Sequence, residues 1–180
     1  MLQITIPETE QWNEKTQEFI TSEERTIQLE HSLVSLSKWE SKWNKAFLTK
    51  KDKTDEETID YIKCMTLTKN VPDELYYCLS NDNIEAINEY IKAPMTATYF
   101  SKHSSTPSKN ELITSELIYY WMIALNIPFE CQYWHLNRLI TLIEVCSIKN
   151  QPPKKMSKRS IMSRNASLNA ARRKQLHTKG

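Results

Sequence analysis

The chain contains one glycine, Gly180, and it is the last residue. Loops that wrap phosphate groups need glycine where the backbone must approach the ligand closely or adopt a positive φ angle. The sequence has neither the GxGxxG pattern of dinucleotide-binding folds nor the GxxxxGKS/T pattern of nucleotide-binding loops. Tight hairpin turns also lose their preferred residue, so Asn and Asp must take the positive-φ positions. A helix-rich fold without a nucleotide cofactor satisfies these limits best.

Charge is divided unevenly along the chain. Residues 1–150 hold all 22 acidic side chains and 15 of the 24 Lys and Arg, for a formal charge of −7. Residues 151–180 hold the other nine basic side chains and no acidic one, for a charge of +9. The first segment is long enough to form one domain with a moderate hydrophobic core. We therefore expect a body over 1–150 and a basic extension over 151–180.

Cysteine use and hydropathy predict synthesis in the cytosol. The four cysteines form no CxxC pair, and the sequence shows no signal peptide or transmembrane run. Reduced, buried thiols are expected, since disulfides are rare in that compartment. We predict no bound metal, no cofactor and no membrane contact.

The first 30 residues show the alternation of half-buried β-strands. Residues 2–6 alternate apolar and polar side chains, and 19–21 and 26–31 continue this pattern. We expect a small antiparallel sheet of about three strands, with 7–16 as a connecting loop.

Helical periodicity begins at residue 32 and extends to residue 149. Apolar residues recur every three or four positions, as on one face of an amphipathic helix. Thr54 with Glu57 forms a capping-box pattern, and Asp82 with Glu85 is a second signal for a helix start. The predicted helices cover residues 32–47, 54–65, 72–79, 82–93, 108–125 and 128–149.

The remaining segments have other compositions. Residues 95–100 are β-branched and aromatic enough for a short strand, and 101–109 form a polar loop. After the proline pair at 152–153, residues 157–176 contain good helix formers but sparse apolar side chains, so any helix there needs a partner. The predicted fold class is mainly α: a helical domain with a small N-terminal antiparallel β-sheet and a basic C-terminal extension.

Cysteine and histidine offer candidate chemistry in the last predicted helix of the body. Cys131 and His135 are four residues apart, which places them on one helix face. Two ligands do not make a zinc site, which needs three or four. A nucleophilic pair, Cys131 with His135 or Cys146 with His103, needs an orienting third group and an oxyanion hole, which nothing in the sequence marks. Core packing is therefore the prediction, and we do not expect an enzyme.

Arg138 lies in the same predicted helix among apolar residues. Its guanidinium can stack on Trp134 or pair with an acidic side chain such as Glu116. The sequence favours a structural ion pair, and the second interpretation is a partner-binding role for Trp134 and Arg138.

A run of three aromatic residues, Tyr119, Tyr120 and Trp121, covers more than one face of its predicted helix. One face must pack in the core, and the other can be solvent-exposed or an interface, where Tyr and Trp are enriched. Phe129 and Tyr133 of the next helix are expected on its core-facing side. The three residues at 119–121 are thus candidates for self-association or partner binding.

The basic extension is the strongest functional signal. Its cations can bind phosphate groups by releasing counterions, but no interleaved aromatic residues, glycine-rich loop or zinc pattern indicates base-specific binding. Four interpretations stay open: a solubilising segment, contact with an acidic protein, contact with nucleic acid, or folding back onto the acidic body. The candidate contact residues are Lys154, Lys155, Lys158, Arg159, Arg164, Arg172, Arg173 and Lys174.

Four segments of the sequence carry a resemblance to known proteins: residues 29–43 (LEHSLVSLSKWESKW), 118–130 (IYYWMIALNIPFE), 134–140 (WHLNRLI) and 168–176 (LNAARRKQL). With these segments the chain resembles, over nearly its whole length, a family of small tailed-bacteriophage morphogenesis proteins. The resemblance implies an α-helical, non-enzymatic tail assembly chaperone in the host cytoplasm, which shields a tape measure or tail-tube protein before assembly. No catalytic residues follow from it. The alternative is a virion structural protein, a head or connector component whose basic tail contacts DNA.

Overall fold

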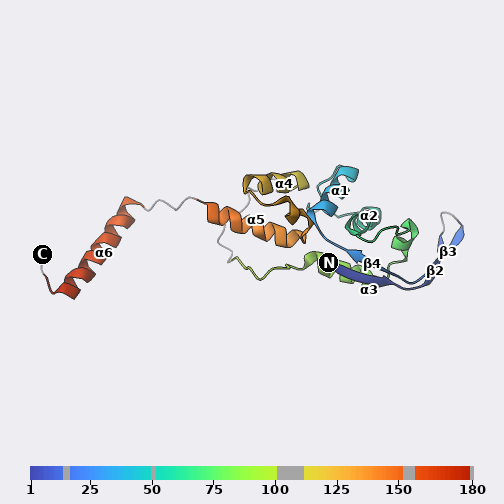
Figure 1. Cartoon of the computed structure of the whole chain (residues 1–180), viewed down its shortest axis with the longest axis horizontal. Coiled ribbons are helices and arrows are strands. Elements are labelled where there is room, and N and C mark those ends of the chain that lie inside the picture. The colour runs from blue at the N-terminus through green and yellow to red at the C-terminus, as the bar shows by residue number, and fades with distance from the viewer. Residues whose placement is uncertain (14–16, 50–51, 101–111, 152–156, 179–180) are drawn as a thin grey trace. The chain divides into compact units, whose positions relative to one another are not determined.

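The computed structural model describes residues 1–13, 17–49, 52–100, 112–151 and 157–178. The chain divides into two compact units, Met1–Ile148 and Lys149–Gly180. The boundary predicted between residues 150 and 151 lies close to this division. The architecture is mainly α, as predicted, with a small antiparallel β part at the N-terminus (Figure 1).

The β part is an antiparallel ribbon with a single register. Its strands are β1 (Leu2–Ile6), β2 (Thr9–Asn13), β3 (Glu18–Ser22) and β4 (Arg25–Leu29). β1 pairs with β4 and β2 with β3, and the residue numbers of every pair sum to 31. Pro7, which has no N–H to donate to a ladder, lies at the interruption between the two pairings.

The ribbon contains more strands than the sequence predicted. Four strands in two two-stranded sheets replace the three predicted strands. The loop predicted over 7–16 is wrong where residues 9–13 form β2, while 14–16 lie outside the described residues. Local hydrophobicity does not identify β2, because its pairing continues the register that β1 and β4 establish.

Short helices make up most of the rest of the first unit, and the last of them, α5, ends two residues beyond it. They are α1 (Leu33–Trp43), α2 (Asp55–Met65), the 3-10 helix η1 (Asp73–Cys78), α3 (Asn81–Lys92), α4 (Ser115–Ala124), the 3-10 helix η2 (Phe129–Tyr133) and α5 (Leu136–Asn150). The predicted capping box of Thr54 and Glu57 is present at α2. Asparagines take three positive-φ positions, as expected for a chain poor in glycine: Asn44, Asn70 and Asn126.

Several predicted boundaries are wrong for local reasons. α1 ends before residue 47 because Asn44 adopts the left-handed conformation with φ of 52°. Ser80, rather than Asp82, caps α3 by accepting a hydrogen bond from the Asn83 backbone N–H. α4 begins after its cap, Thr114, rather than at 108. Residues 95–100 form no strand. The polar loop predicted over 101–109 lies outside the described residues.

The single helix predicted over 128–149 is also wrong. Trp134 is extended, with ψ of 161°, and separates η2 from α5. The chain uses this break to pair with the segment after β4: the Leu136 backbone N–H donates to the His31 carbonyl at 2.7 Å. A tertiary contact therefore ends the first helix where the sequence has neither Gly nor Pro.

Two hydrophobic clusters fill the first unit, and α1 contributes to both. Trp39 packs in a cluster with residues of β1, β4, α2, η1 and α3. Leu33 and Leu36 pack in a second cluster with residues of α4, η2 and α5. α1 thus holds the β-containing half and the α4–α5 half together.

The second unit contains α6 (Lys158–Leu176), the longest helix of the described chain. Ser157 caps its N-terminus by accepting from the Ser160 backbone N–H. Every residue from 157 to 178 is exposed. A helix does form over the predicted residues, with none of its side chains buried.

Candidate protein-binding surface

α4 is positioned by a buried carboxylate of α1. Glu40 is 7% exposed, and its two oxygens accept backbone N–H groups from Phe47 at 2.9 Å and from Ser115 at 2.7 Å. The second bond ties the first residue of α4 to α1. Ile118 and Met122 then face inward, into the cluster that Leu33 and Leu36 share.

The outer side of α4 is apolar although it faces solvent. Tyr120 is 63% exposed and Ile123 is 61% exposed. Tyr119, Tyr120 and Ile123 share one arc of the helix because residues three or four apart lie on the same face. Glu116, the only charged residue in α4, is exposed at the N-terminal end of the same arc, four residues before Tyr120. A nearly uncharged helix is normally buried, so a half-exposed one indicates an interface.

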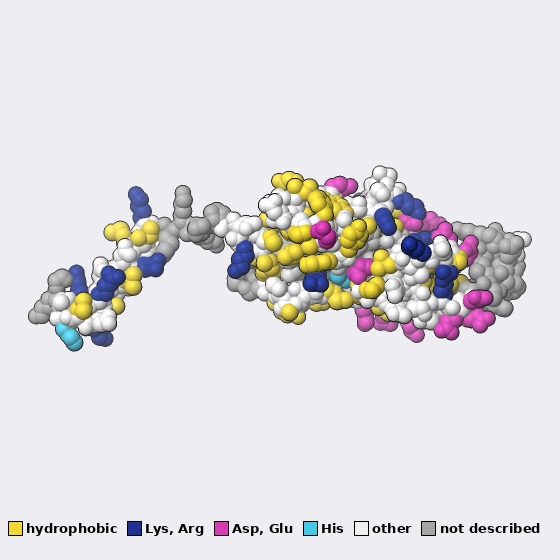
Figure 2. All heavy atoms as spheres, in the orientation of Figure 1, with side chains coloured by type: hydrophobic (Ala, Val, Ile, Leu, Met, Phe, Trp, Pro, Cys, Tyr) yellow, Lys and Arg dark blue, Asp and Glu magenta, His cyan; other side chains and the backbone are white. Residues whose placement is uncertain are grey.

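η2 extends this apolar face. Phe129 and Tyr133 are 53% and 64% exposed. The rings of Tyr119 and Phe129 lie 6.5 Å apart, and the Tyr119 hydroxyl donates to Gln132 Oε1 at 2.9 Å. Burial, together with nearby Tyr133, raises the pKa of Tyr119. We call Tyr119, Tyr120, Ile123, Phe129 and Tyr133 the aromatic surface; Figure 2 shows hydrophobic side chains gathered over α4 and α5.

Sequence reasoning found only part of this surface. Tyr120 lies fully in it, and Tyr119 lies at its edge because it is half-buried against the second cluster. Trp121 is half-buried against the same cluster and turns to another side of α4. The expectation that Phe129 and Tyr133 face the core is wrong, because the break at Trp134 separates them from α5. Ile123 was also missed, although its three-residue spacing from Tyr120 would have indicated it.

Trp134 and Arg138 lie next to the aromatic surface rather than in it. The Arg138 guanidinium lies 4.2 Å from the centre of the Trp134 ring, which is the stacking alternative. No ion pair of Arg138 occurs within the described residues, so the favoured ion pair with Glu116 is not seen there. Both residues line a hollow of about 300 Å³ that Tyr133 also borders.

Hydrogen bonds pair the polar groups of this hollow with one another. The Tyr90 hydroxyl donates to Glu30 Oε1 at 2.7 Å, and the Met1 ammonium lies 2.9 Å from Glu30 Oε2. His135 Nδ1 accepts from the Asn137 backbone N–H, so Nε2 carries the proton that is donated to the Tyr90 carbonyl. Burial raises the pKa of Tyr90 and lowers that of His135. These contacts hold the polar groups in place and connect different segments of the fold.

His135, which lines this hollow, contacts a second buried histidine. The rings of His31 and His135 are 5.1 Å apart, and His31 Nδ1 lies 2.5 Å from the Tyr61 hydroxyl. Burial, with a smaller effect of His135, lowers the pKa of His31 to about 3. Both imidazoles are therefore neutral at pH 7 and act as hydrogen-bonding core residues.

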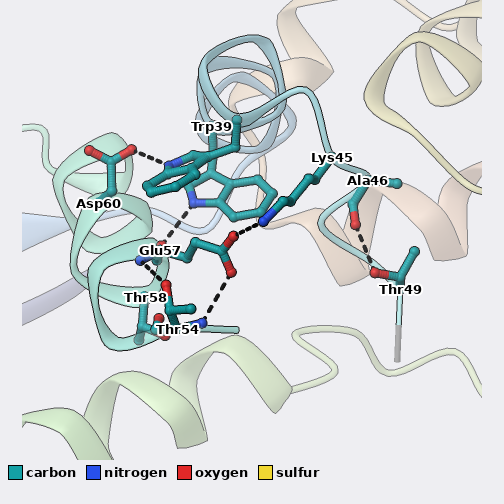
Figure 3. Close-up of polar contacts among 9 residues, drawn as sticks. Trp39, Lys45, Ala46, Thr49, Thr54, Glu57, Thr58 and Asp60 are labelled. Carbon is teal, nitrogen blue, oxygen red and sulfur yellow. Dashed lines mark hydrogen bonds and ion pairs between the residues drawn. The ribbon is translucent and has the colours of Figure 1, made fainter. Parts of the chain in front are cut away.

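A second polar cluster joins α1 to α2 (Figure 3). The Trp39 indole donates to the Glu57 carbonyl at 2.8 Å, and the Glu57 carboxylate pairs with Lys45. Asp60 accepts from the Trp43 indole at 2.9 Å and pairs with Lys42. The hydrogen bond to Lys45 lowers the pKa of Glu57, and that to Asp60 raises the pKa of Lys42.

This α1–α2 cluster borders a hollow of about 480 Å³, with Trp39 and Leu112 among its walls. The two carboxylates of the cluster, Glu57 and Asp60, are already paired with lysines or backbone N–H groups of the fold. In the described chain, no buried side-chain N or O atom lacks a hydrogen-bond partner. The cluster thus stabilises the joint between two helices.

The predicted Cys131–His135 pair does not form a shared helix face. Cys131 lies in η2 and His135 follows the break, with both His135 nitrogens engaged as described above. Burial raises the pKa of the Cys131 and Cys64 thiols, which keeps them protonated. Within the described residues, no three His, Cys, Asp or Glu side chains are placed to hold a metal ion. His103 lies outside those residues.

The basic extension belongs to the second unit. Six of its predicted contact residues, Lys158, Arg159, Arg164, Arg172, Arg173 and Lys174, lie on α6 and are exposed. Lys154 and Lys155 fall outside the described residues. None of the described helices is long and apolar enough to cross a membrane.

Comparisons of the chain with models of protein families, with curated proteins and with solved structures found no match.

Proposed function

We propose that this chain is a non-enzymatic assembly factor that binds a structural protein through the aromatic surface. The exposure of Tyr120 and Ile123 on α4 and of Phe129 and Tyr133 on η2, with Tyr119 and Phe129 in ring contact between the two helices, supports this proposal. Removing such side chains from water contributes about 25 cal/mol per Å² of apolar area, and the freedom that the two partners lose on binding offsets part of this gain. Large aromatic residues also supply most of the strong contacts in protein interfaces.

The resemblance of the sequence to tailed-bacteriophage morphogenesis proteins gives the proposal its specific form. The chain would act in the host cytoplasm as a tail assembly chaperone. Its aromatic surface would cover an apolar or strand-edge region of a tape measure or tail-tube protein until assembly. Such shielding requires an exposed apolar face, which Tyr120 and Ile123 provide on α4.

A binding experiment tests this proposal. The full chain is co-expressed with candidate tail-tube and tape measure proteins, and the complex is isolated through a tag on the candidate partner. We expect Tyr120→Glu combined with Ile123→Glu to abolish co-purification, because two charges would be buried at the interface. Tyr99→Glu is the matched control, since Tyr99 is 84% exposed and lies outside the aromatic surface. Equal co-purification of all variants would contradict the proposal.

A second candidate function is that of a virion structural protein, which the exposed basic helix α6 favours. Mass spectrometry of purified virions separates the two. A chaperone is absent from the finished particle, whereas a head or connector component is present in many copies.

A further inference from the structure

α6 has the composition and exposure of a helix that binds in a groove. Residues 151–180 contain no acidic side chain, and all 19 residues of α6 are exposed. At 1.5 Å per residue, α6 is about 28 Å long. Its diameter of about 10–12 Å with side chains matches the width of the major groove of B-DNA, about 12 Å.

The distribution of charge around α6 indicates which class of anionic partner fits the helix. A helix that lies on a membrane needs one apolar arc and one charged arc. The apolar residues Ile161, Met162 and Leu168 of α6 are instead interspersed with cations on all sides. A flat acidic protein surface would likewise contact one arc only. A groove with phosphates along both walls contacts a helix on several sides.

One face of α6 carries two asparagines together with Lys158, which lies seven residues before Asn165, and arginines lie to both sides of that face. Asn165 and Asn169 are four residues apart and so lie above one another. Arg172 and Arg173 follow Asn169 by three and four residues, which places them on opposite flanks of that face. Arg164 and Arg159 extend these two flanks toward the N-terminus of the helix.

We propose that α6 binds the major groove of double-stranded DNA. The four arginines contact phosphates on the two walls, and Asn165 and Asn169 face the base edges, where Asn can form a bidentate pair with adenine. The proposal involves only the second unit, so it does not rest on protein binding by the aromatic surface.

The first test is fluorescence anisotropy of labelled 20-base-pair DNA titrated with the full chain at several salt concentrations. Each phosphate contact contributes about −0.9 to the slope of log affinity against log salt, so four contacts predict a slope of about −4. Arg172→Ala with Arg173→Ala should reduce its magnitude by about two. Lys38→Ala with Lys92→Ala, an equal loss of charge in the first unit, should leave the slope unchanged. Equal slopes for all variants would overturn the proposal.

Competitors of the same charge identify the partner. Double-stranded RNA should compete poorly, because its major groove is too narrow and deep for a helix. Polyglutamate and vesicles with anionic lipid should also compete poorly. Competition by any of them equal to that of unlabelled DNA overturns insertion into the DNA groove.

The asparagine pair is tested separately with duplexes that differ in sequence. Asn165→Ala with Asn169→Ala retains all charges, so the salt slope should stay near −4 while affinity differences between duplexes shrink by about tenfold, within the range for one bidentate contact. Unchanged differences would overturn the assignment of these residues to base edges.

Discussion

α5 and α6 are both helices of the C-terminal third, yet opposite causes stabilise them. Leu136, Leu139 and Ile143 of α5 are buried in the second cluster, so tertiary packing fixes this helix. α6 buries none of its residues and depends on its Ser157 cap and on helix formers such as Ala170 and Ala171. Substitutions in the first unit should therefore change global stability, while those in α6 change only local helicity and binding.

The largest effect is expected from the carboxylate that links α1 to α4. Glu40→Ala leaves the buried N–H groups of Phe47 and Ser115 without their acceptors, which should lower the free energy of unfolding by roughly 3 kcal/mol. Urea denaturation followed by circular dichroism measures this loss. Glu85→Ala, at an exposed position of α3, should change it by less than about 0.5 kcal/mol. Equal losses would show that the two bonds contribute nothing.

Acid should destabilise the first unit through its buried histidines. The pKa of His31 is lowered from 6.5 to about 3 in the folded chain. Below pH 6.5 the unfolded chain therefore binds a proton that the folded chain does not, and stability falls as the pH decreases toward 3. The loss from His31 is roughly 2 kcal/mol at pH 5. The lowered pKa of His135 acts in the same direction.

Variants of single histidines assign this acid effect. Unfolding free energies of His31→Gln measured between pH 7 and 4 should depend less on pH than those of the original chain. His177→Gln changes an exposed histidine of the second unit and should retain the full dependence. If His31→Gln keeps the original slope, other groups cause the acid effect.

A smaller change is expected at the cation–π pair beside the aromatic surface. Arg138→Ala removes the guanidinium from the Trp134 ring and should cost about 0.5–1 kcal/mol, because Arg138 is exposed. Trp134 fluorescence should also change. Arg138→Lys retains the charge with a different geometry and should recover only part of the stability. No loss in either variant would show that the stack forms without stabilising the fold.

The smallest effect on stability is expected from removing the second unit. Truncation after Asn150 should shift the free energy of unfolding by less than about 0.5 kcal/mol, because no α6 side chain is buried. Helical circular dichroism should decrease by the contribution of α6. Loss of cooperative unfolding in the truncated chain would show that α6 belongs to the packed domain and would remove the contrast with α5.

Local signals were sufficient at the start of α2. Thr54 and Glu57 predicted the start of α2 because both partners of the capping box are close in sequence. They were insufficient at β2, whose pairing depends on a register established by β1 and β4, and at Trp134, where contact with the segment at His31 interrupts the helix.

For the candidate surface, too, the sequence predicted some residues and missed others. The apolar composition of α4 made Tyr119 and Tyr120 candidates, since an uncharged helix with aromatic residues on several faces cannot bury all of them. Phe129 and Tyr133 could not be assigned from the sequence, because the break at Trp134 determines their direction. The exposed α6 follows from the absence of acidic and the scarcity of apolar residues beyond 150.

The bond between Glu40 and Ser115 also has a kinetic consequence. It joins residues 75 positions apart, so the chain must close a long loop before this contact can form. Contacts of such sequence separation slow folding, and those that form after the transition state mainly affect the unfolding rate. We expect the α1–α4 contact to form late, after α1 has packed on α2. The α4–α5 half, which carries the aromatic surface, would then be the first part of the unit to open.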